Sequence, residues 1–480
     1  MIVRGGQVVT PSGVGNWDVA IQGEKIIAVA EPGVISPEGI KVVDASGKIV
    51  VPGGIEPHAH LRSDISREGY GSTSGVEVVS RAAIYGGTTT ILDFADQGDR
   101  PDLQPALEEG SERWRGNGYT DYSYHLTFAS GVSTSVINQI PEVIQAGFAS
   151  FKVFTTKRVG LQTLHGGGKS WDRTLPKTDF GTMSAIMGQI ADSGGMLLVH
   201  SEDEDIVQYN YSLAKERGQW DYWNLHLIHS NLSEDMSFRR VIRLAEITDC
   251  PLYFVHVSAK EGVVAIAEAR DRGQPVYGET LPNYACFNSD NYLEENGMKY
   301  HTYPSLKSSS DANELWAGLL DGRLSTVGTD QGFETWEDKT RFKTVADVIG
   351  GNNGIEARVG IVYSEGVVKR GMPLNRFVDV TSANAAMIFG LYPRKGAIAV
   401  GSDADLTLID PSIHETITND DLHLSDYSPW EGWDIQGWPV TMILRGKIMV
   451  EDRKLVGSPG HGQLLTTRSI ATGVRSKPVC

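Results

Sequence analysis

The sequence predicts an α/β fold, a (β/α)8 TIM-type barrel with a small β-sandwich domain formed from both chain ends. Two observations support the barrel. Short apolar runs, typical of buried parallel strands, alternate between residues 52 and 395 with longer amphipathic stretches typical of helices. Residues able to react or to bind metal stand at the ends of several of these runs. A third observation supports the sandwich, because strand-like runs separated by turns occur at both ends of the chain.

The strand-like runs near the two ends set the expected domain boundaries. They cover residues 7–10, 17–21, 25–29, 405–410, 439–444 and 447–450. We therefore expect one sandwich from residues 1–51 and 396–460, attached to a barrel of residues 52–395. The chain after Gly457 is rich in Gly, Ser and Thr, so residues 461–480 are expected to form an irregular C-terminal tail or an arm that grips a partner.

The composition is that of a large soluble enzyme. With 480 residues and 40% hydrophobic content, the chain can bury a substantial core. The formal charge of −17 argues against nucleic acid or an anionic membrane as a partner. Apolar runs stay short of the roughly 18–20 residues that span a bilayer, and the first residues lack the features of a signal peptide. Three widely spaced cysteines, Cys250, Cys286 and Cys480, fit a cytoplasmic location.

A pair of histidines is the most informative local feature. Residues 54–60 read Gly-Ile-Glu-Pro-His-Ala-His and follow an apolar, strand-like run at 48–52. Side chains two apart on a strand point to the same face. His58 and His60 can therefore direct two imidazoles at one metal ion. The pair alone fits two surface or hydrogen-bonded histidines equally well, so the rest of the chain has to supply further ligands.

Four further apolar runs carry such residues. Runs at 195–199, 251–255 and 324–329 end at His200, His256 and Asp330, and the run at 148–154 contains Lys152. In a barrel, residues at the C-terminal ends of strands face the same mouth, so these side chains would converge. Each has a simpler explanation, namely a hydrogen-bonded core histidine or an aspartate that caps a turn. A buried lysine is rare unless it is paired or functional.

The order of these residues resembles that of the amidohydrolase superfamily in its binuclear subtype. The similarity extends over nearly the whole chain and favours the cyclic amidohydrolases, which are the hydantoinases and dihydropyrimidinases with allantoinase and dihydroorotase as relatives. It is especially close at residues 363–366, 377–382 and 389–396, and in the segment Gly-Ala-Ile-Ala-Val-Gly-Ser-Asp-Ala-Asp-Leu at 396–406.

The resemblance implies a centre of two divalent metal ions. Carbon dioxide would carbamylate Lys152, which turns a cation into a carboxylate able to bridge both metals. His58, His60 and Asp330 would bind one ion, and His200 and His256 the other. Imidazole and carboxylate ligands favour Zn²⁺, although manganese and iron also fit. Hydantoinase-like enzymes also imply a homotetramer, for which the aromatic stretch at 427–433 offers either a contact surface or part of the sandwich core.

The implied reaction is the hydrolysis of a cyclic amide, which opens a ureide, imide or lactam ring. A hydroxide that bridges the two metals would attack the carbonyl. Asp330 would take the proton during attack and then donate it to the departing amide nitrogen.

The residues expected to contact the substrate depart from the hydantoinase pattern. Arg62 completes a His-x-His-x-Arg motif resembling that of dihydroorotases, where the arginine binds a substrate carboxylate, but it also fits a salt bridge with Asp64 or Asp96. Lys157 stands where hydantoinases usually carry a tyrosine, and Tyr303 stands in place of a serine that contacts the cyclic amide. A cation in the pocket favours an anionic substrate, unless Lys157 points to solvent. The histidine that usually follows the metal aspartate is Gln331.

Two glycine-rich segments predict loops near the substrate. The glycines at 166–168, within residues 161–179, fit a mobile lid or an ordinary surface loop. Residues 350–354 correspond to a loop that lines the pocket, with Asn352 as a candidate substrate contact. No Gly-Lys-Ser/Thr sequence follows, so this is not a phosphate-binding loop.

Other functions on the same scaffold remain open. A non-catalytic assembly or signalling relative would have lost metal ligands, whereas every expected ligand type is present here in order. A deaminase usually lacks the bridging lysine. A decarboxylase of an anionic ring is compatible with Arg62, and release of carbon dioxide instead of ring opening would identify it.

Overall fold

The structure is a computed structural model that describes residues 1–61, 64–67, 71–128, 132–156, 177–466 and 470, with backbone alone at 64–67 and 71–74. Arg62, Lys157 and the glycines at 166–168 lie outside the described residues, so the structure does not test their predicted roles.

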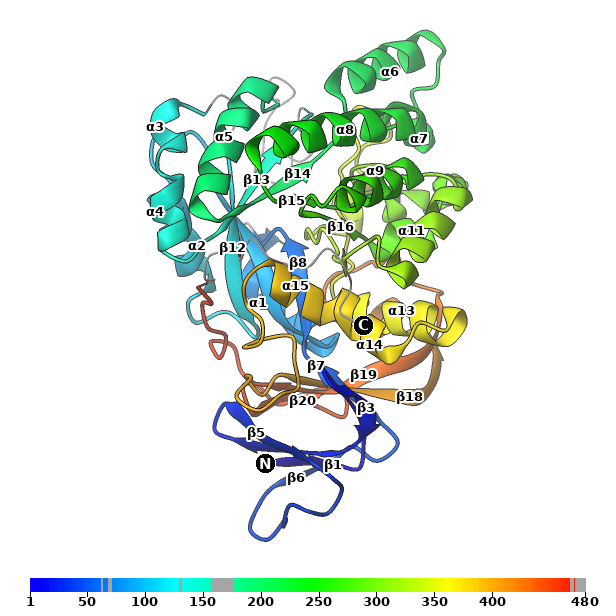
Figure 1. Ribbon diagram of the computed structural model, residues 1–480. Helices are drawn as coiled ribbons and strands as arrows, with labels where there is room; N and C mark the ends of the chain where they lie inside the picture. The colour runs from blue at the N-terminus through cyan, green and yellow to red at the C-terminus, as the bar shows by residue number, and fades with distance from the viewer. Residues whose placement is uncertain (62–63, 68–70, 129–131, 157–176, 467–469, 471–480) are drawn as a thin grey trace.

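Eight parallel strands form one sheet that curls into a nearly closed barrel (Figure 1). In sheet order they are β8 (Gly54–Ala59), β11 (Thr88–Asp96), β12 (Asp121–Thr127), β13 (Ser150–Phe154), β14 (Met196–His200), β15 (Leu252–Phe254), β16 (Val276–Thr280) and β17 (Thr326–Val327). The order in the sheet follows the chain, as in a (β/α)8 barrel. Beyond the end of β17, a parallel bridge between Ala59 and Gln331 brings the two edges together. The predicted barrel is confirmed.

Helices surround the barrel on its outside (Figure 1). They are α1 (Gly75–Tyr85), α2 (Gln104–Trp114), α3 (Thr134–Ile137), α4 (Ile140–Gln145), α5 (Phe180–Ser193), α6 (Glu204–Glu216), α7 (Leu225–Ile228), α8 (Asn231–Thr248), α9 (Lys260–Asp271), α10 (Pro282–Cys286), α11 (Ser309–Asp321), α12 (Trp336–Thr340), α13 (Arg358–Val362), α14 (Leu374–Val378) and α15 (Asn384–Ile388). Local chemistry sets their ends: α11 begins at a capping box of Ser308 with Asp311 and ends at Gly322, whose φ is 90°. Among the described residues, none of these helices has the length and apolar character needed to cross a membrane.

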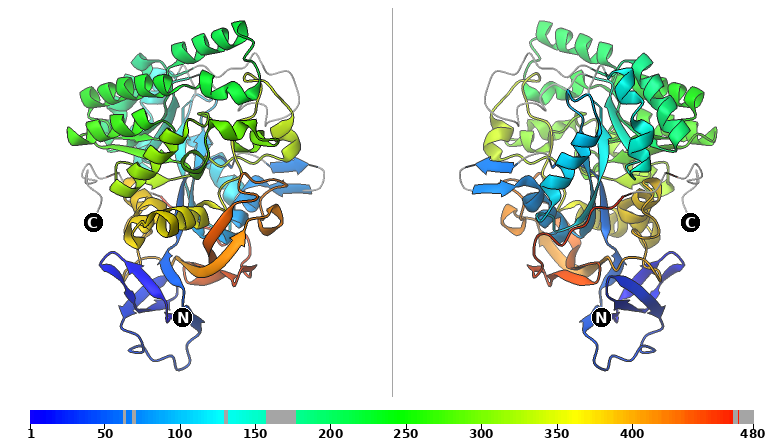
Figure 2. Two further views of the ribbon diagram at one scale, coloured as in Figure 1. Left: turned by 90° about the vertical axis from the view of Figure 1, so that its right-hand side faces the viewer. Right: turned by 90° about the vertical axis from the view of Figure 1, so that its left-hand side faces the viewer.

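Short elements complete the barrel domain. They are the hairpin β9 (Asp64–Arg67) and β10 (Gly71–Ser74), the 3-10 turns η2 (Tyr222–Asn224), η3 (Ser289–Leu293) and η4 (Gly297–Tyr300), and the π-helical turns η5 (Tyr363–Val368) and η6 (Asp379–Ala383). Another 3-10 turn, η7 (Asn419–Asp421), lies in the C-terminal segment. The β9–β10 hairpin follows β8 directly and projects from the side of the barrel (Figure 2).

The two chain ends build two sheets beneath the barrel (Figure 1). One has the order β5 (Lys25–Ala30), β4 (Asp18–Gln22), β1 (Ile2–Arg4), β6 (Val42–Asp44); the other has the order β21 (Lys454–Leu455), β20 (Lys447–Glu451), β19 (Asp434–Leu444), β18 (Leu406–Thr416), β7 (Ile49–Pro52), β2 (Gln7–Thr10), β3 (Gly13–Asn16). Antiparallel pairing of β7 with β18 joins the two ends of the chain. Val19, Val50 and Leu406 pack in one cluster between the sheets. The boundaries 1–51, 396–460 and 52–395 stay a proposal.

The apolar run at 48–52 is not the strand that carries the histidines. It forms β7 of the terminal sheet, and the separate strand β8 begins at Gly54 and carries His58. The chain passes from sandwich to barrel at Gly53, where a Cβ atom would lie 2.1 Å from the Thr89 hydroxyl oxygen. Only glycine fits at this position. The boundary between the two strands is not visible in the sequence, because the apolar pattern continues across it.

The aromatic stretch at 427–433 belongs to the core. Tyr427 and Trp430 are buried, and the Trp430 ring lies 4.9 Å from that of Phe287. Of the two predicted roles, the burial of these side chains favours a place in the core over a contact surface between subunits, and the predicted tetramer itself stays a prediction.

The described start of the C-terminal tail is pinned to the barrel. Gln463 accepts a backbone hydrogen bond from Tyr122, and Leu465 donates one back to Tyr122 at 2.7 Å. Leu465 and Ile470 are both buried. The predicted tail of 461–480 is thus irregular where it is described, but this part of it lies along β12 instead of extending from the surface.

Candidate metal centre

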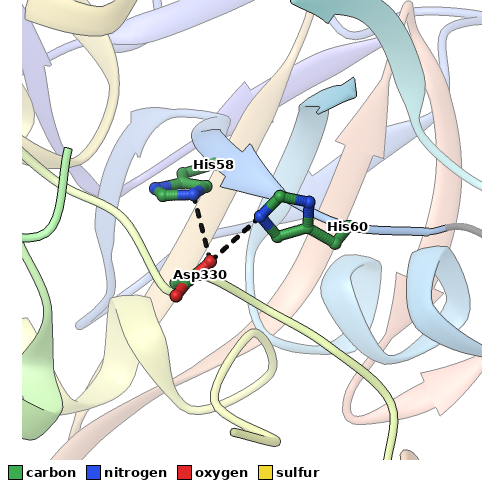
Figure 3. A group of neighbouring side chains, drawn as sticks. All are labelled: His58, His60 and Asp330. Carbon is green, nitrogen blue, oxygen red and sulfur yellow. Dashed lines mark ion pairs between the residues drawn. The ribbon is translucent and has the colours of Figure 1, made fainter. Parts of the chain in front are cut away.

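The first three predicted ligands meet at the C-terminal mouth of the barrel (Figure 3). His58 lies near the end of β8, His60 just beyond it, and Asp330 three residues after β17. The Nε2 atoms of His58 and His60 lie 3.0 and 3.1 Å from the same Asp330 oxygen, Oδ1. The backbone amide of His60 donates to the Gln331 carbonyl at 2.8 Å, which fixes the two strand ends side by side.

The second pair of histidines lies next to the first group. His200 is the last residue of β14, and His256 follows β15. His200 Nδ1 and His256 Nε2 are 2.9 Å apart, and the His256 ring centroid lies 5.4 Å from that of His58. The structure thus brings all four predicted histidines into one cluster.

Lys152 lies on β13 and is buried. Its Nζ atom is 5.6 Å from the ring centre of Phe94 and 5.0 Å from that of Phe154. Phe94 also stacks on His60 with 4.4 Å between ring centres. The lysine therefore points to the same mouth of the barrel as the histidines.

Two buried glutamates orient the histidines, and the sequence analysis missed both. His58 donates from Nδ1 to Glu279 Oε1 at 2.8 Å, and His200 donates from Nε2 to Glu202 Oε2 at 3.1 Å. Each bond fixes the orientation of the ring and directs the other ring nitrogen into the cluster, the arrangement found behind metal-bound histidines. Glu279 lies inside β16, and Glu202 is two residues after His200. A carboxylate within or beside a buried strand was the signal available in the sequence.

A buried ion pair, Glu56 with Arg358, lies next to the backbone of His58. Glu56 Oε1 accepts from the backbone amides of His58 and Thr329, both at 3.0 Å. Its Oε2 pairs with Arg358 Nε at 3.2 Å. Burial, only partly offset by the charge of Arg358, raises the pKa of Glu56 to about 7. Glu56 thereby ties the β8 ligands to the segment that carries Asp330.

The electrostatics of the cluster favour added positive charge. Burial alone would lower the pKa of His58, but Glu279 and Asp330 outweigh it and raise this pKa to about 9. Burial alone would raise the pKa of Asp330, but the charge of His58 and bonds from His58 and His60 hold it well below its usual value. Burial lowers the pKa of His200 and His256, which keeps both rings neutral. Neutral imidazoles beside an ionised carboxylate are ligands that fit divalent cations such as Zn²⁺.

Tyr303 and Asn352, the candidate substrate contacts that the structure describes, both bond or pack against other residues of the chain. The Tyr303 ring packs against His229 and His301, with centroids 4.9 and 4.5 Å away, and its hydroxyl donates to the Val348 carbonyl at 3.3 Å. Asn352 is fully buried, and its Nδ2 donates to the Thr329 carbonyl at 2.9 Å. Both side chains therefore brace the loops around Asp330, and their role in binding substrate stays a prediction.

Gln331 takes a structural position after the metal aspartate. Its Oε1 accepts from the backbone amides of Gly354 and Ile355 at 2.9 and 3.0 Å. The side chain therefore holds the glycine-rich loop against the strand end that carries Asp330.

A second acidic cluster has a cation of its own. Asp121, Asp403 and Asp405 lie close enough to share a metal ion, but Lys395 Nζ lies among them at 2.6, 3.0 and 2.6 Å. We therefore regard this group as a buried ion-pair network.

Comparison with known proteins agrees with this geometry. The profile described as Amidohydrolase family matches residues 249–449. A D-hydantoinase of Geobacillus stearothermophilus is 35% identical over 96% of this chain and 95% of its own. A D-hydantoinase of Streptomyces coelicolor is 33% identical over 96% of both chains. The crystal structure of dihydropyrimidinase from Brevibacillus agri NCHU1002 covers 98% of this chain and 99% of its own, with a TM-score of 0.88 and 33% identity. The chain therefore belongs to the amidohydrolase family, in its cyclic amidohydrolase branch.

Proposed function

We propose that the protein hydrolyses a cyclic amide ring at a centre of two divalent metal ions. The observation that carries this proposal is the meeting of His58, His60 and Asp330 with His200 and His256 at one mouth of the barrel. Ring-opening hydrolysis is the activity of the branch to which the chain belongs. No described feature of the chain favours a decarboxylase or a non-catalytic role.

The proposed assignment of ligands follows the two groups of side chains. His58, His60 and Asp330 would hold one cation, His200 and His256 would hold the other, and Lys152, once carbamylated, would supply a further anionic ligand. Zn²⁺ is the proposed ion, and carbon dioxide is the proposed source of the carbamate. Two such ions, when bound, lower the pKa of a shared water and polarise the amide carbonyl.

Asp330 is the proposed catalytic residue because its carboxylate lies 3.0 and 3.1 Å from the Nε2 atoms of His58 and His60, at the mouth of the barrel. Its low pKa keeps it deprotonated before reaction. It accepts the proton of the attacking water and transfers it to the amide nitrogen as the ring opens. Thr302 donates to Asp330 Oδ2 at 3.3 Å, which helps to orient the carboxylate for both transfers.

A metal and substrate screen tests this function. Protein purified without chelator should contain close to two divalent ions per chain, and the mass of the intact chain should include the carbamate. The substrate panel should contain both enantiomers of 5-substituted hydantoins, together with dihydropyrimidines, imides and lactams. Each class should be tested with and without a carboxylate. Ring opening should disappear after chelation and return with Zn²⁺. Carbon dioxide release without ring opening would contradict the proposal.

Arg62 is the proposed recognition group for a substrate carboxylate. Arg62→Met should lower kcat/KM for a carboxylate-bearing ring by about 10- to 150-fold, because a hydrogen bond to a charged group contributes about 1.5–3 kcal/mol. A neutral ring analogue should lose little. Equal losses on both substrates would assign Arg62 to a structural role.

We further propose that the enzyme is a cytoplasmic homotetramer. Light scattering at micromolar concentration tests the assembly, and a stable monomer would contradict it.

A further inference from the structure

Thr127, the last residue of β12, carries a buried hydroxyl group that has no hydrogen-bond partner among the described residues. Only 3% of the residue is exposed. Hydroxyl groups buried to this degree usually have a partner, so the Thr127 hydroxyl is free to bond a group that the structure does not contain, such as a water molecule or a modified side chain.

The register of the strands places this hydroxyl beside Lys152. Thr127 is the direct partner of Lys152 in the parallel pairing of β12 with β13, and Phe128 donates its backbone N–H to the Lys152 carbonyl at 3.0 Å. Neighbouring residues in register on parallel strands point to the same face.

The layer below shows that this face is the inside of the barrel. His125 and Ser150 precede Thr127 and Lys152 by two residues each, and His125 Nδ1 accepts from the Ser150 hydroxyl at 2.7 Å. His125 Nε2 donates past the intervening strand β11 to the Pro57 carbonyl on β8, at 3.0 Å. Because side chains alternate along a strand, Thr127 and Lys152 form the next inner layer, closer to the metal centre.

We propose that the Thr127 hydroxyl donates a hydrogen bond to the carbamate on Lys152 and so stabilises the modified lysine. This inference rests on the proposed carbamylation. In that step the neutral Nζ forms a bond to the carbon of carbon dioxide, one C=O electron pair moves to oxygen, and the nitrogen releases a proton. The unmodified ammonium has only donors to offer, whereas the carbamate supplies acceptor oxygens for the hydroxyl. Thr127 is thus a positioning residue that favours the modified state.

Thr90 supplies a matched control within the same barrel. Its hydroxyl is also fully buried and without a partner among the described residues. It lies in register with Asp121, the first residue of β12, whereas Thr127 is the last. Thr90→Val therefore makes the same chemical change on β11, beside the start of β12 and remote from Lys152.

The test measures how much bicarbonate is needed to modify Lys152. Chelator-treated protein is reloaded with Zn²⁺ at graded concentrations of ¹³C-bicarbonate, and the carbamate carbon signal and bound zinc are recorded. Thr127→Val should raise the half-saturating bicarbonate concentration by about 10-fold or more, as expected for losing a hydrogen bond to a charged group. Thr127→Ser, which keeps the hydroxyl, and Thr90→Val should behave like the wild type. Thr127→Ala provides a second variant without the hydroxyl should the valine protein fail to fold.

The outcomes separate this inference from the function on which it rests. Equal bicarbonate dependence of the wild type and of the folded variants without the hydroxyl would overturn the role of Thr127 and leave the metal centre intact. Absence of any carbamate signal in wild-type protein would overturn the bridging lysine, and the role of Thr127 with it. Equal shifts in Thr127→Val and Thr90→Val would assign the effect to general loosening of the barrel, which also contradicts the proposal.

Discussion

Asp330 and His256 both adopt left-handed backbone conformations, with φ of 50° and 42°. Residues other than glycine rarely do so, and a bulky side chain such as histidine does so at some cost. Both residues follow short barrel strands and carry proposed ligands. The backbone turns sharply at each position, which directs the side chain into the mouth of the barrel.

Replacing Asp330 tests its proposed role as base and acid. Asp330→Asn preserves size but cannot accept and return a proton in the same way, so turnover should fall at least about 10²- to 10⁴-fold. Turnover and zinc content should be measured on the same preparations. Asp192→Asn, an exposed change on α5, should leave both unchanged. Near-normal turnover of Asp330→Asn would remove Asp330 from this role.

The two supporting glutamates should affect different metal ions. Glu202→Gln weakens the orientation of His200, and Glu279→Gln weakens that of His58, so each should lower the affinity for one ion by about 10- to 100-fold. Dialysis against graded chelator, followed by elemental analysis, should leave an intermediate state with one ion per chain that the wild type lacks.

Glu234→Gln is the control for this pair of variants. Glu234 is also buried, but it accepts hydrogen bonds from Ser258 and Ala259, and neither residue is a proposed ligand. Its metal retention should match that of the wild type. If all three variants released metal alike, the effect would reflect general destabilisation instead of ligand orientation.

At the level of elements, the sequence predicted the strands that carry Lys152 and His200 and those that precede His256 and Asp330, because each is an apolar run that stands out locally. The supporting carboxylates were not distinguished, since Glu202 and Glu279 are two among 60 acidic residues and only burial sets them apart. The sequence left open whether Trp430 is buried or lies in a contact surface, because its burial depends on Phe287, far away in the chain. Contacts between distant segments leave no local pattern.

His125, on the inner face of β12, is expected to make the free energy of unfolding depend on pH in the acid range. Burial, opposed by the bond to the Pro57 carbonyl, lowers the pKa of His125 to about 3. The unfolded chain, with an ordinary histidine pKa near 6.5, therefore binds an extra proton between about pH 6.5 and 3. This contribution to stability is complete above pH 6.5 and is lost as the pH falls, by about 1.4 kcal/mol per pH unit.

His125→Gln should remove this dependence while keeping an N–H donor near the Pro57 carbonyl. Free energies of unfolding from urea titrations at pH 6, 5 and 4 should fall less steeply for this variant than for the wild type. His414→Gln, an exposed histidine on β18, should follow the wild-type slope. Parallel slopes for His125→Gln and the wild type would mean that His125 takes up its proton in the folded protein.

On the scale of the whole molecule, one buried ion-pair network connects the barrel to the sandwich. Lys395 binds Asp121, at the start of barrel strand β12, and also Asp403 and Asp405, which precede β18 of the sandwich. Arg445, between β19 and β20, adds a bond to Asp121 at 3.1 Å and donates to the carbonyl of His461 in the tail. The barrel, the sandwich and the start of the C-terminal tail are therefore all bonded to this network.

Lys395→Met should destabilise the protein by about 3–5 kcal/mol, because it leaves buried carboxylates without their central cation. Burial alone would lower the pKa of Lys395, but the three aspartates outweigh it and raise this pKa, so the ammonium is the stable form. Urea unfolding at neutral pH measures the loss. Lys25→Met is the matched control: Lys25 bonds the same Asp403 at 2.7 Å, but 47% of its side chain is exposed, so its loss should cost below about 1 kcal/mol. Similar losses from both variants would mean that Arg445 alone neutralises the cluster, and the contact between barrel and sandwich would then depend on apolar packing instead of on Lys395.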